Sequence, residues 1–332
     1  MMASNTKQPI LINSLLEPQV LNKYDTFLFD ANGVFWNGST LVDSITKEMK
    51  ELVKYGKKVC VVSNTTSSAE SMKKTYEKRG LGYEAYNEFI TSGDLLRYAA
   101  ESGDLETKLN KKLKPTEKFT IYIFGKPREW LEDYFYITNN PQEADFIYLS
   151  VPQFREEGKM KIIAKHPELA KYFKLSGTKF RDQEWWDVAE GGENIFEETL
   201  KELSSYGKPF VNANPDLYAN EKDMSAGGQR NSVVRNGYVA NKLKIMGHKI
   251  VEYGKPSPDI FEFAIKKLYP EDTAGINILK EKIIMIGDTR GTDIDGAKNF
   301  GIDSVLVSTG NEAKTGLEGK NSGATYFFKV LE

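Results

Sequence analysis

The chain has 332 residues, enough for a full sheet-and-helix core and a second domain, and its composition does not indicate disorder. Lys and Arg number 45 and Asp and Glu number 47, so the formal charge is -2. This balance excludes a general electrostatic attraction to nucleic acid or an anionic membrane, and a small molecule is the expected partner.

Cysteine content and hydropathy narrow the class of protein further. Cys60 is the only cysteine and lies among valines, so we expect a small buried side chain and no disulfide within the chain. The N-terminus lacks a basic start followed by a long apolar stretch, and no segment approaches the length that spans a membrane. We therefore expect a cytoplasmic enzyme.

The first part of the chain alternates strands with helices. Strands are predicted at Phe27–Asp30, Lys58–Ser63 and Phe89–Thr91, and helices at Ser44–Tyr55 and Ser68–Arg79. Such alternation predicts a parallel, doubly wound α/β sheet.

The alternation is interrupted by an insertion and then returns after about Asn212. The insertion has predicted strands of its own, at Phe119–Phe124, Asp145–Ser150 and Phe210–Val211. The returning pattern comprises a turn and helix over Gly254–Leu268, a strand at Lys282–Asp288, a helix at Asp293–Phe300 and a strand at Ser304–Val307. We predict a core domain of residues 1–91 and 212–332 and an inserted domain of residues 92–211.

The first polar motif is Asp30-Ala31-Asn32-Gly33-Val34, which directly follows a predicted strand. In an open parallel sheet the carboxyl ends of the strands open onto a crevice, and a nearby glycine lets backbone N–H groups approach an anion. A nucleophile would lie at the position of Asp30. The same residue types also form ordinary turns, so this segment alone favours a simple exit from the strand.

Three further motifs follow in order. Ser63-Asn64-Thr65-Thr66 ends a predicted strand, and Ser63 is placed to hold an anion. Gly254-Lys255-Pro256-Ser257-Pro258 fixes a lysine between glycine and proline before a helix. Gly287-Asp288-Thr289-Arg290-Gly291-Thr292-Asp293 ends another buried-type strand with carboxylates, which are oxygen ligands suited to Mg²⁺.

Together these four motifs resemble those of the haloacid dehalogenase-like (HAD-like) phosphatases. Three segments narrow the resemblance to the class IIA group, which includes NagD-like and 4-nitrophenyl phosphatases: Thr91-Ser92-Gly93, Asn212-Ala213-Asn214-Pro215-Asp216 and the motif Gly254–Pro258 itself. The resemblance extends from about Tyr24 to about Gly310. It implies a HAD-like doubly wound parallel-sheet (Rossmannoid) core with an inserted class II α/β cap domain that closes over the crevice.

The resemblance also implies an activity: Mg²⁺-dependent hydrolysis of a small phosphorylated metabolite, such as a sugar phosphate or a nucleotide, through an aspartyl-phosphate intermediate. Asp30 would be the nucleophile. Mg²⁺ would be held by Asp30, the backbone carbonyl of Asn32 and Asp288. Asp293 would serve the metal through water or orient Lys255, although these two residues could also form an ordinary surface ion pair.

The remaining expectations concern the phosphate, the substrate and assembly. The phosphoryl group would be bound by Ser63, Asn64, Lys255, Ala31 and Asn32. Asn214 and Asp216 would face the substrate or form only a turn, and Arg290 would steer an anionic substrate or lie at the rim. Relatives of this kind imply a homodimer formed through the cap. Nothing in the sequence identifies the metabolite.

The chain departs from its family at Asn32, where most of these phosphatases carry the Asp that serves as general acid and base. An amide does not exchange protons near neutral pH, so catalysis worth about 10²–10⁴ in rate is missing unless another group supplies it. Three explanations are open: a phosphatase that uses good leaving groups or an acid from the cap, a phosphate-binding protein without turnover, or an introduced substitution that traps a ligand.

Overall fold

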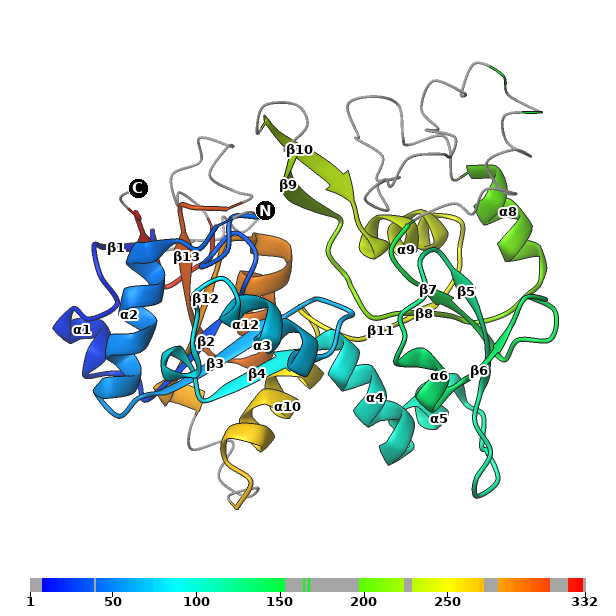
Figure 1. Ribbon diagram of the computed structural model, residues 1–332, viewed down its shortest axis with the longest axis horizontal. Coiled ribbons are helices and arrows are strands. Elements are labelled where there is room, and N and C mark those ends of the chain that lie inside the picture. The colour runs from blue at the N-terminus through cyan, green and yellow to red at the C-terminus, as the bar shows by residue number, and fades with distance from the viewer. Residues whose placement is uncertain are drawn as a thin grey trace, which may run out of the picture. The chain divides into compact units, whose positions relative to one another are not determined.

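The computed structural model describes residues 8–38, 40–152, 164, 167, 197–223, 229–271, 280–310 and 322–330. The chain forms two compact units (Figure 1). The first comprises Met1–Leu95, Asn220–Arg230 and Tyr253–Glu332, and the second comprises Leu96–Ala219 and Asn231–Glu252. Each unit is built around its own parallel sheet.

The first unit contains a seven-stranded sheet in the order β1-β14-β13-β12-β2-β3-β4, and all of its neighbouring strands are parallel. From β4 to β14 the strands follow the doubly wound order 3-2-1-4-5-6. The strands on either side of the pair β2 and β12 are therefore added in opposite directions across the sheet, and this pair marks the point at which the strand order reverses. The strands are β1 (Ile10–Ile12), β2 (Thr26–Phe29), β3 (Lys58–Ser63), β4 (Glu88–Thr91), β12 (Ile283–Gly287), β13 (Asp303–Val307) and β14 (Tyr326–Phe328).

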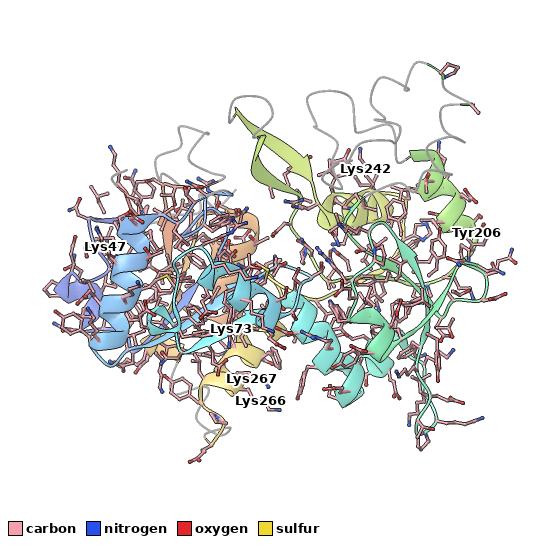
Figure 2. The ribbon with its side chains drawn as sticks, in the orientation of Figure 1. Lys47, Lys73, Tyr206, Lys242, Lys266 and Lys267 are labelled. Carbon is pink, nitrogen blue, oxygen red and sulfur yellow. The ribbon has the colours of Figure 1, made fainter. Side chains whose placement is uncertain are left out.

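Helices of the first unit pack on this sheet through apolar residues spaced one turn apart. In α2, for example, Ile45, Met49 and Leu52 are buried at helical spacing. Lys47 on the same helix is exposed and extends away from the sheet (Figure 2). The helical segments are α1 (Pro18–Leu21), α2 (Asp43–Lys54), α3 (Ala69–Glu77), η1 (Tyr83–Ala85), α10 (Pro258–Leu268), η5 (Lys280–Lys282), the π-helical turn η6 (Arg290–Ile294) and α12 (Asp295–Phe300). Helix α4 (Ser92–Ser102) begins in this unit and continues into the second.

The central strands of this sheet are buried along their whole length. Every residue of β2 and of β12 is buried, as expected for parallel strands that are covered by helices on both faces. On one face, Phe27 and Phe29 pack with Ile284 and Ile286 in a single hydrophobic cluster. The predicted α/β class and doubly wound parallel sheet are confirmed.

The second unit contains a five-stranded parallel sheet in the order β11-β8-β7-β5-β6. Its strands are β5 (Thr120–Phe124), β6 (Tyr136–Thr138), β7 (Phe146–Leu149), β8 (Phe210–Asn212) and β11 (Ile250–Glu252). Helices α8 (Glu197–Ser205) and α9 (Asn236–Ile245) lie on one side, and α5 (Asp104–Leu109) and α6 (Leu131–Tyr134) lie on the other (Figure 1). A separate two-stranded sheet joins β9 (Tyr218–Asp223) to β10 (Gln229–Val234).

The predicted return to the core domain at residue 212 differs from the structure, in which Asn220–Arg230 joins the first unit and the chain returns for the last time at Tyr253. The reason is that β11 pairs in parallel with β8, so that Ile250–Glu252 completes the second sheet. Helix α9 packs its Val239 and Leu243 into the same cluster as Ile147 and Leu149 of β7. The outgoing boundary, predicted after residue 91, lies at Leu95.

Within the described residues, no helix is both long and apolar enough to cross a lipid bilayer.

Candidate active site

The candidate active site lies at the carboxyl ends of β2 and β12, the two strands between which the strand order of the first sheet reverses. Phe29 of β2 is in register with Ile286 of β12, and the backbone N–H of Asp30 donates to the carbonyl of Ile286 over 2.9 Å. Asp30 and Asp288 therefore leave adjacent strands at the same edge of the sheet. Parallel pairing brings together two carboxylates that are far apart in the sequence.

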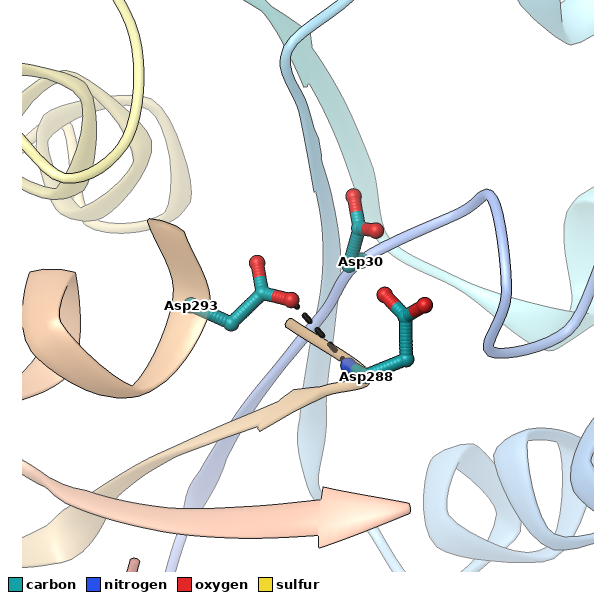
Figure 3. A group of neighbouring side chains, drawn as sticks. All are labelled: Asp30, Asp288 and Asp293. Carbon is teal, nitrogen blue, oxygen red and sulfur yellow. Dashed lines mark hydrogen bonds between the residues drawn. The ribbon is translucent and has the colours of Figure 1, made fainter. Parts of the chain in front are cut away.

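Asp293 joins this pair. One carboxylate oxygen from each of Asp30, Asp288 and Asp293 lies within 4.8 Å of the others (Figure 3). Asp293 is completely buried, and its Oδ2 accepts hydrogen bonds from the backbone N–H groups of Asp288 and Thr289, each at 3.1 Å. The first turn of η6 thereby fixes Asp293 against the end of β12.

Lys255 is the cation of this group. Its side chain is 1% exposed, and its Nζ lies 2.7 Å from Asp30 Oδ1 and 2.7 Å from Asp293 Oδ1. These four side chains contribute three carboxylates and a single ammonium, so they hold an excess of negative charge in a largely buried place. Buried charge of this kind requires compensation, and a divalent cation with oxygen ligands would provide it.

The position of Lys255 is set by Asn64, which follows β3. The Asn64 Nδ2 donates to the carbonyl of Lys255 over 2.9 Å, and its Oδ1 accepts the Lys255 backbone N–H over 2.7 Å. Asn64 is 3% exposed, so both hydrogen bonds are shielded from water. Ser63, the last residue of β3, is buried at the carboxyl end of the strand next to β2.

Two glycines leave room for the Asp288 carboxylate. A Cβ atom on Gly33 would lie 2.2 Å from Asp288 Oδ2, and one on Gly310 would lie 1.8 Å from the same atom. Gly33 also has a φ of +90°, a conformation that side chains disfavour. Thr309 ties these segments together, because its hydroxyl donates to the Gly33 carbonyl over 2.5 Å. Thr309 and Gly310 are not among the site residues predicted from the sequence.

The loop after Asp30 is folded back on itself. The Gly33 N–H donates to the carbonyl of Trp36 over 2.7 Å, and the Trp36 N–H donates to the carbonyl of Ala31 over 3.0 Å. The Trp36 ring packs edge-on against Tyr76, with centroids 5.8 Å apart. Burial raises the pKa of Tyr76, and the negative charge of Asp30 raises it further. Ala31 and half-buried Asn32 are thus held in a closed turn beside Asp30.

The predicted substrate residues fall in different units. Arg290 begins η6 in the first unit, directly after Thr289. Asn214 and Asp216 belong to the second unit, where Asn214 Oδ1 accepts the backbone N–H of Asp216 over 3.1 Å. This hydrogen bond supports the turn that the sequence also suggested for these two residues.

Family models match both parts of the first unit. The model described as haloacid dehalogenase-like hydrolase matches residues 27–130, and the model described as HAD-hydrolase-like matches residues 252–332. These ranges contain Asp30, Asp288 and Asp293, the carboxylates that meet at the sheet edge. The chain belongs to the haloacid dehalogenase-like hydrolases.

Several relatives of this HAD-like hydrolase carry phosphatase names. Phosphoglycolate phosphatase 2 of Arabidopsis thaliana is 26% identical over 319 residues, which cover 95% of this chain and 92% of the relative. An acid sugar phosphatase of Staphylococcus haemolyticus is 28% identical over 162 residues, 47% of this chain and 56% of that protein. The sequence predicted a member of the HAD-like family and a hydrolytic enzyme, and both predictions are confirmed.

Solved structures show the same fold. A haloacid dehalogenase-like hydrolase from Brucella suis superimposes with a TM-score of 0.69 at 21% identity, covering 97% of this chain and 100% of the other. The 4-nitrophenylphosphatase of Thermotoga maritima gives a TM-score of 0.59 at 20% identity, covering 93% and 95% of the two chains.

Proposed function

We propose that this HAD-like hydrolase is a Mg²⁺-dependent phosphatase that cleaves a small phosphomonoester through an aspartyl-phosphate on Asp30. The observation that carries the proposal is the convergence of Lys255 with three carboxylates at the reversal point of the first sheet. Crevices at this position of an open α/β sheet are the usual ligand sites of such folds.

The residues fit a divalent cation. Asp30 and Asp288 would ligate it directly, since the oxygens of Asp293 already contact Lys255 and two backbone N–H groups. Asp293 would therefore support the site by orienting Lys255 and the end of β12. The close approach of Gly33 and Gly310 gives Asp288 the space to point at the metal. When bound, Mg²⁺ would neutralise charge on the phosphoryl oxygens.

The other steps of the reaction would be carried by side chains of the protein. The Asp30 carboxylate attacks phosphorus, the bond to the leaving oxygen breaks, and water later cleaves the new bond between Asp30 and phosphorus. Lys255 and the Ser63 hydroxyl would donate to phosphoryl oxygens as charge develops there. For Asn64 we propose a positioning role in place of phosphate binding, because its amide contacts the Lys255 backbone at both ends.

Asn32 limits the kind of ester that would be cleaved quickly. The leaving oxygen must gain a proton unless it is stable as an anion, and the Asn32 amide cannot supply one. Aryl and acyl phosphates would therefore be better substrates than alkyl phosphates. The same observation favours a second candidate function, in which the site binds phosphate or a phosphorylated metabolite without turnover.

The substrate class is a small phosphorylated metabolite. This proposal is supported by the relatives named phosphoglycolate phosphatase and acid sugar phosphatase, and by the absence of a strong net charge that would attract a polyanion. Cytoplasmic location and a dimer formed through the inserted domain stay predictions.

Hydrolysis of 4-nitrophenyl phosphate by the full chain, with and without Mg²⁺, tests the function. We expect turnover that needs Mg²⁺ and disappears in Asp30→Asn, which keeps the shape of the side chain but not its nucleophilic charge. Turnover that persists in Asp30→Asn would contradict the mechanism. Mg²⁺-dependent phosphate binding without turnover would instead establish the second candidate function.

A further inference from the structure

The segment that follows β13 reaches across to the loop that follows β2. Thr309 lies just beyond the end of β13 at Val307, and its hydroxyl donates to the carbonyl of Gly33 over 2.5 Å. Strand β12 lies between β2 and β13 in the sheet. The hydrogen bond therefore spans the carboxyl end of β12, where Asp288 leaves the strand.

The segment that carries Thr309 is anchored on its other side to the end of β14. The backbone N–H of Ser308 donates to the carbonyl of Phe328 over 3.1 Å, and the Ser308 hydroxyl accepts the backbone N–H of Val330 over 3.0 Å. Thr309 is 7% exposed, so water has little access to its side chain. Thr309 thus holds Gly33 from a fixed position.

Both backbone polar groups of Gly33 are hydrogen-bonded. Its carbonyl accepts the Thr309 hydroxyl, and its N–H donates to the carbonyl of Trp36 over 2.7 Å. The peptide bond between Asn32 and Gly33 is trans, so the Asn32 carbonyl points to the side opposite the Gly33 N–H. The direction of this carbonyl, which the family resemblance implies as a metal ligand, is therefore fixed by the contacts of Gly33.

The Asp288 carboxylate has little room to move. A Cβ atom would lie 2.2 Å from Asp288 Oδ2 on Gly33 and 1.8 Å from it on Gly310, so the backbone encloses this oxygen from two segments. The other oxygen, Oδ1, accepts the Thr289 hydroxyl over 3.2 Å. Asp288 is 1% exposed, and its carboxylate points toward Asp30 (Figure 3).

The two divalent cations that carboxylates commonly bind differ in the space that they need. Mg²⁺ demands near-ideal octahedral geometry with oxygens at about 2.0–2.1 Å, whereas Ca²⁺ binds oxygens at about 2.3–2.6 Å in irregular and flexible arrangements. Selectivity between the two ions depends on the size of the site and on the freedom of its ligands. A site whose ligands cannot move apart favours the smaller ion.

We propose that Thr309 is a positioning residue that makes the site at Asp30 and Asp288 select Mg²⁺ over Ca²⁺. By holding Gly33 against Asp288, the Thr309 hydroxyl keeps the Asn32 carbonyl and the Asp288 carboxylate from separating to the distances that Ca²⁺ requires. This inference rests on the proposed function, because it concerns the metal site of that activity. Thr309 acts through Gly33 and does not itself ligate the ion.

Calorimetric titration of the full chain with MgCl₂ and, separately, with CaCl₂, without substrate, tests the proposal. We expect the native chain to bind Mg²⁺ more tightly than Ca²⁺. Thr309→Val keeps the shape of the side chain but removes the donor, and it should raise the Kd for Mg²⁺ about 10–100-fold. The Kd for Ca²⁺ should change much less, because Ca²⁺ tolerates ligands that have moved apart.

Two further variants at Thr309 separate the hydroxyl from the rest of the side chain. Thr309→Ser retains the donor and should keep the native preference for Mg²⁺. Thr309→Ala also removes the donor and should shift the ratio of the two Kd values in the same direction as Thr309→Val. The test therefore does not depend on the folding of a single variant.

Thr46→Val is the matched control in the first unit. Thr46 is also 7% exposed, and its hydroxyl also donates to a backbone carbonyl, that of Asp43 over 3.1 Å, but in helix α2. Melting temperatures in EDTA measure the stability that each variant loses without a metal ion. We expect Thr46→Val and Thr309→Val to lose similar stability, and only Thr309→Val to change the ratio of the two Kd values.

Four results would overturn the proposal: no preference for Mg²⁺ in the native chain, an unchanged ratio of the two Kd values in Thr309→Val and Thr309→Ala, an equal change in Thr46→Val, or a loss of selectivity in Thr309→Ser. Because the titrations contain no substrate, they do not depend on turnover. A native chain that selects Mg²⁺ but hydrolyses no phosphomonoester would contradict the proposed phosphatase function and leave the role of Thr309 in place.

Discussion

The side-chain amide of Asn64 is hydrogen-bonded at both ends to the backbone of Lys255, over 2.9 and 2.7 Å. Lys255 in turn holds Asp30 and Asp293 through its ammonium group. A residue at the end of β3 therefore sets the position of a cation that contacts two carboxylates.

Asn64→Ala should lower both stability and activity. Two buried backbone groups of Lys255 lose their partner, which typically costs about 1–3 kcal/mol of unfolding free energy for each unsatisfied group. Urea unfolding and kcat with 4-nitrophenyl phosphate measure the two effects. Asn87→Ala is the control, because Asn87 Oδ1 also accepts a backbone N–H, that of Val59 at 2.7 Å, but elsewhere in the sheet. Loss of stability without loss of kcat in Asn64→Ala would contradict the positioning role.

Asn32→Asp should raise turnover selectively. The new carboxyl group can protonate the leaving oxygen, so we expect a gain of about 10²–10⁴ in kcat for alkyl phosphates. The gain should be much smaller for 4-nitrophenyl phosphate, whose leaving group is stable as an anion. Equal gains for both esters would show that Asn32→Asp acts through something other than proton transfer.

Gly310→Ala should weaken Mg²⁺ binding. The added Cβ would lie 1.8 Å from Asp288 Oδ2, so the carboxylate must move. Changes next to metal ligands typically reduce affinity by about 10–100-fold, and the Mg²⁺ concentration for half-maximal activity should rise accordingly. Gly291→Ala is the control, because beyond its own chain neighbours and helix backbone no atom lies within 4 Å of its added Cβ. An unchanged Mg²⁺ requirement in Gly310→Ala would argue against Asp288 as a ligand.

The carboxyl group of Asp303 should make the free energy of unfolding depend on pH under acidic conditions. Burial, the largest influence, raises the pKa of Asp303, but hydrogen bonds from Lys23, Tyr24 and Thr325 outweigh it, so the pKa lies below its usual value. A carboxyl with a lowered pKa stabilises the folded state above its unfolded pKa of about 3.9, and this contribution is lost as the pH falls through the folded pKa. Asp303→Asn should therefore be less stable than the native chain at neutral pH.

The difference between the native chain and Asp303→Asn should shrink below about pH 4, as urea unfolding at several pH values would show. Asp25→Asn is the control, since Asp25 pairs with Lys57 at 3.1 Å but its side chain is 59% exposed, and exposed pairs contribute little. A difference in unfolding free energy between the native chain and Asp303→Asn that stays constant across this pH range would contradict a lowered pKa for Asp303.

Much of the first unit could be predicted because its signals are local. The strand at Lys58–Ser63 was predicted with the bounds that the structure has, since an apolar run ends there in a polar loop. The meeting of Asp30 with Asp288 was also predictable, because the carboxyl ends of parallel strands share one edge. The predicted helix at Asp293–Phe300 begins earlier in the structure, with the π-helical turn at Arg290.

The remaining features depend on contacts that are distant in the sequence. Asn64 and Lys255 are separated by 191 positions, so the role of the Asn64 amide could not be predicted from its own segment. Strands β6 and β11 have three residues each and gain stability only as neighbours in the second sheet. The predicted domain boundary at residue 212 therefore preceded the strand that completes that sheet.

The pairing of β2 with β12 also has a consequence for biosynthesis. The ribosome makes Asp30 early and Asp288 late, and the whole second unit is translated between them. A nascent chain that has not yet emerged as far as β12 contains Asp30, and later Lys255, but neither Asp288 nor Asp293. The proposed metal site would therefore be complete only late in synthesis, and a product truncated before β12 would lack two of its three carboxylates.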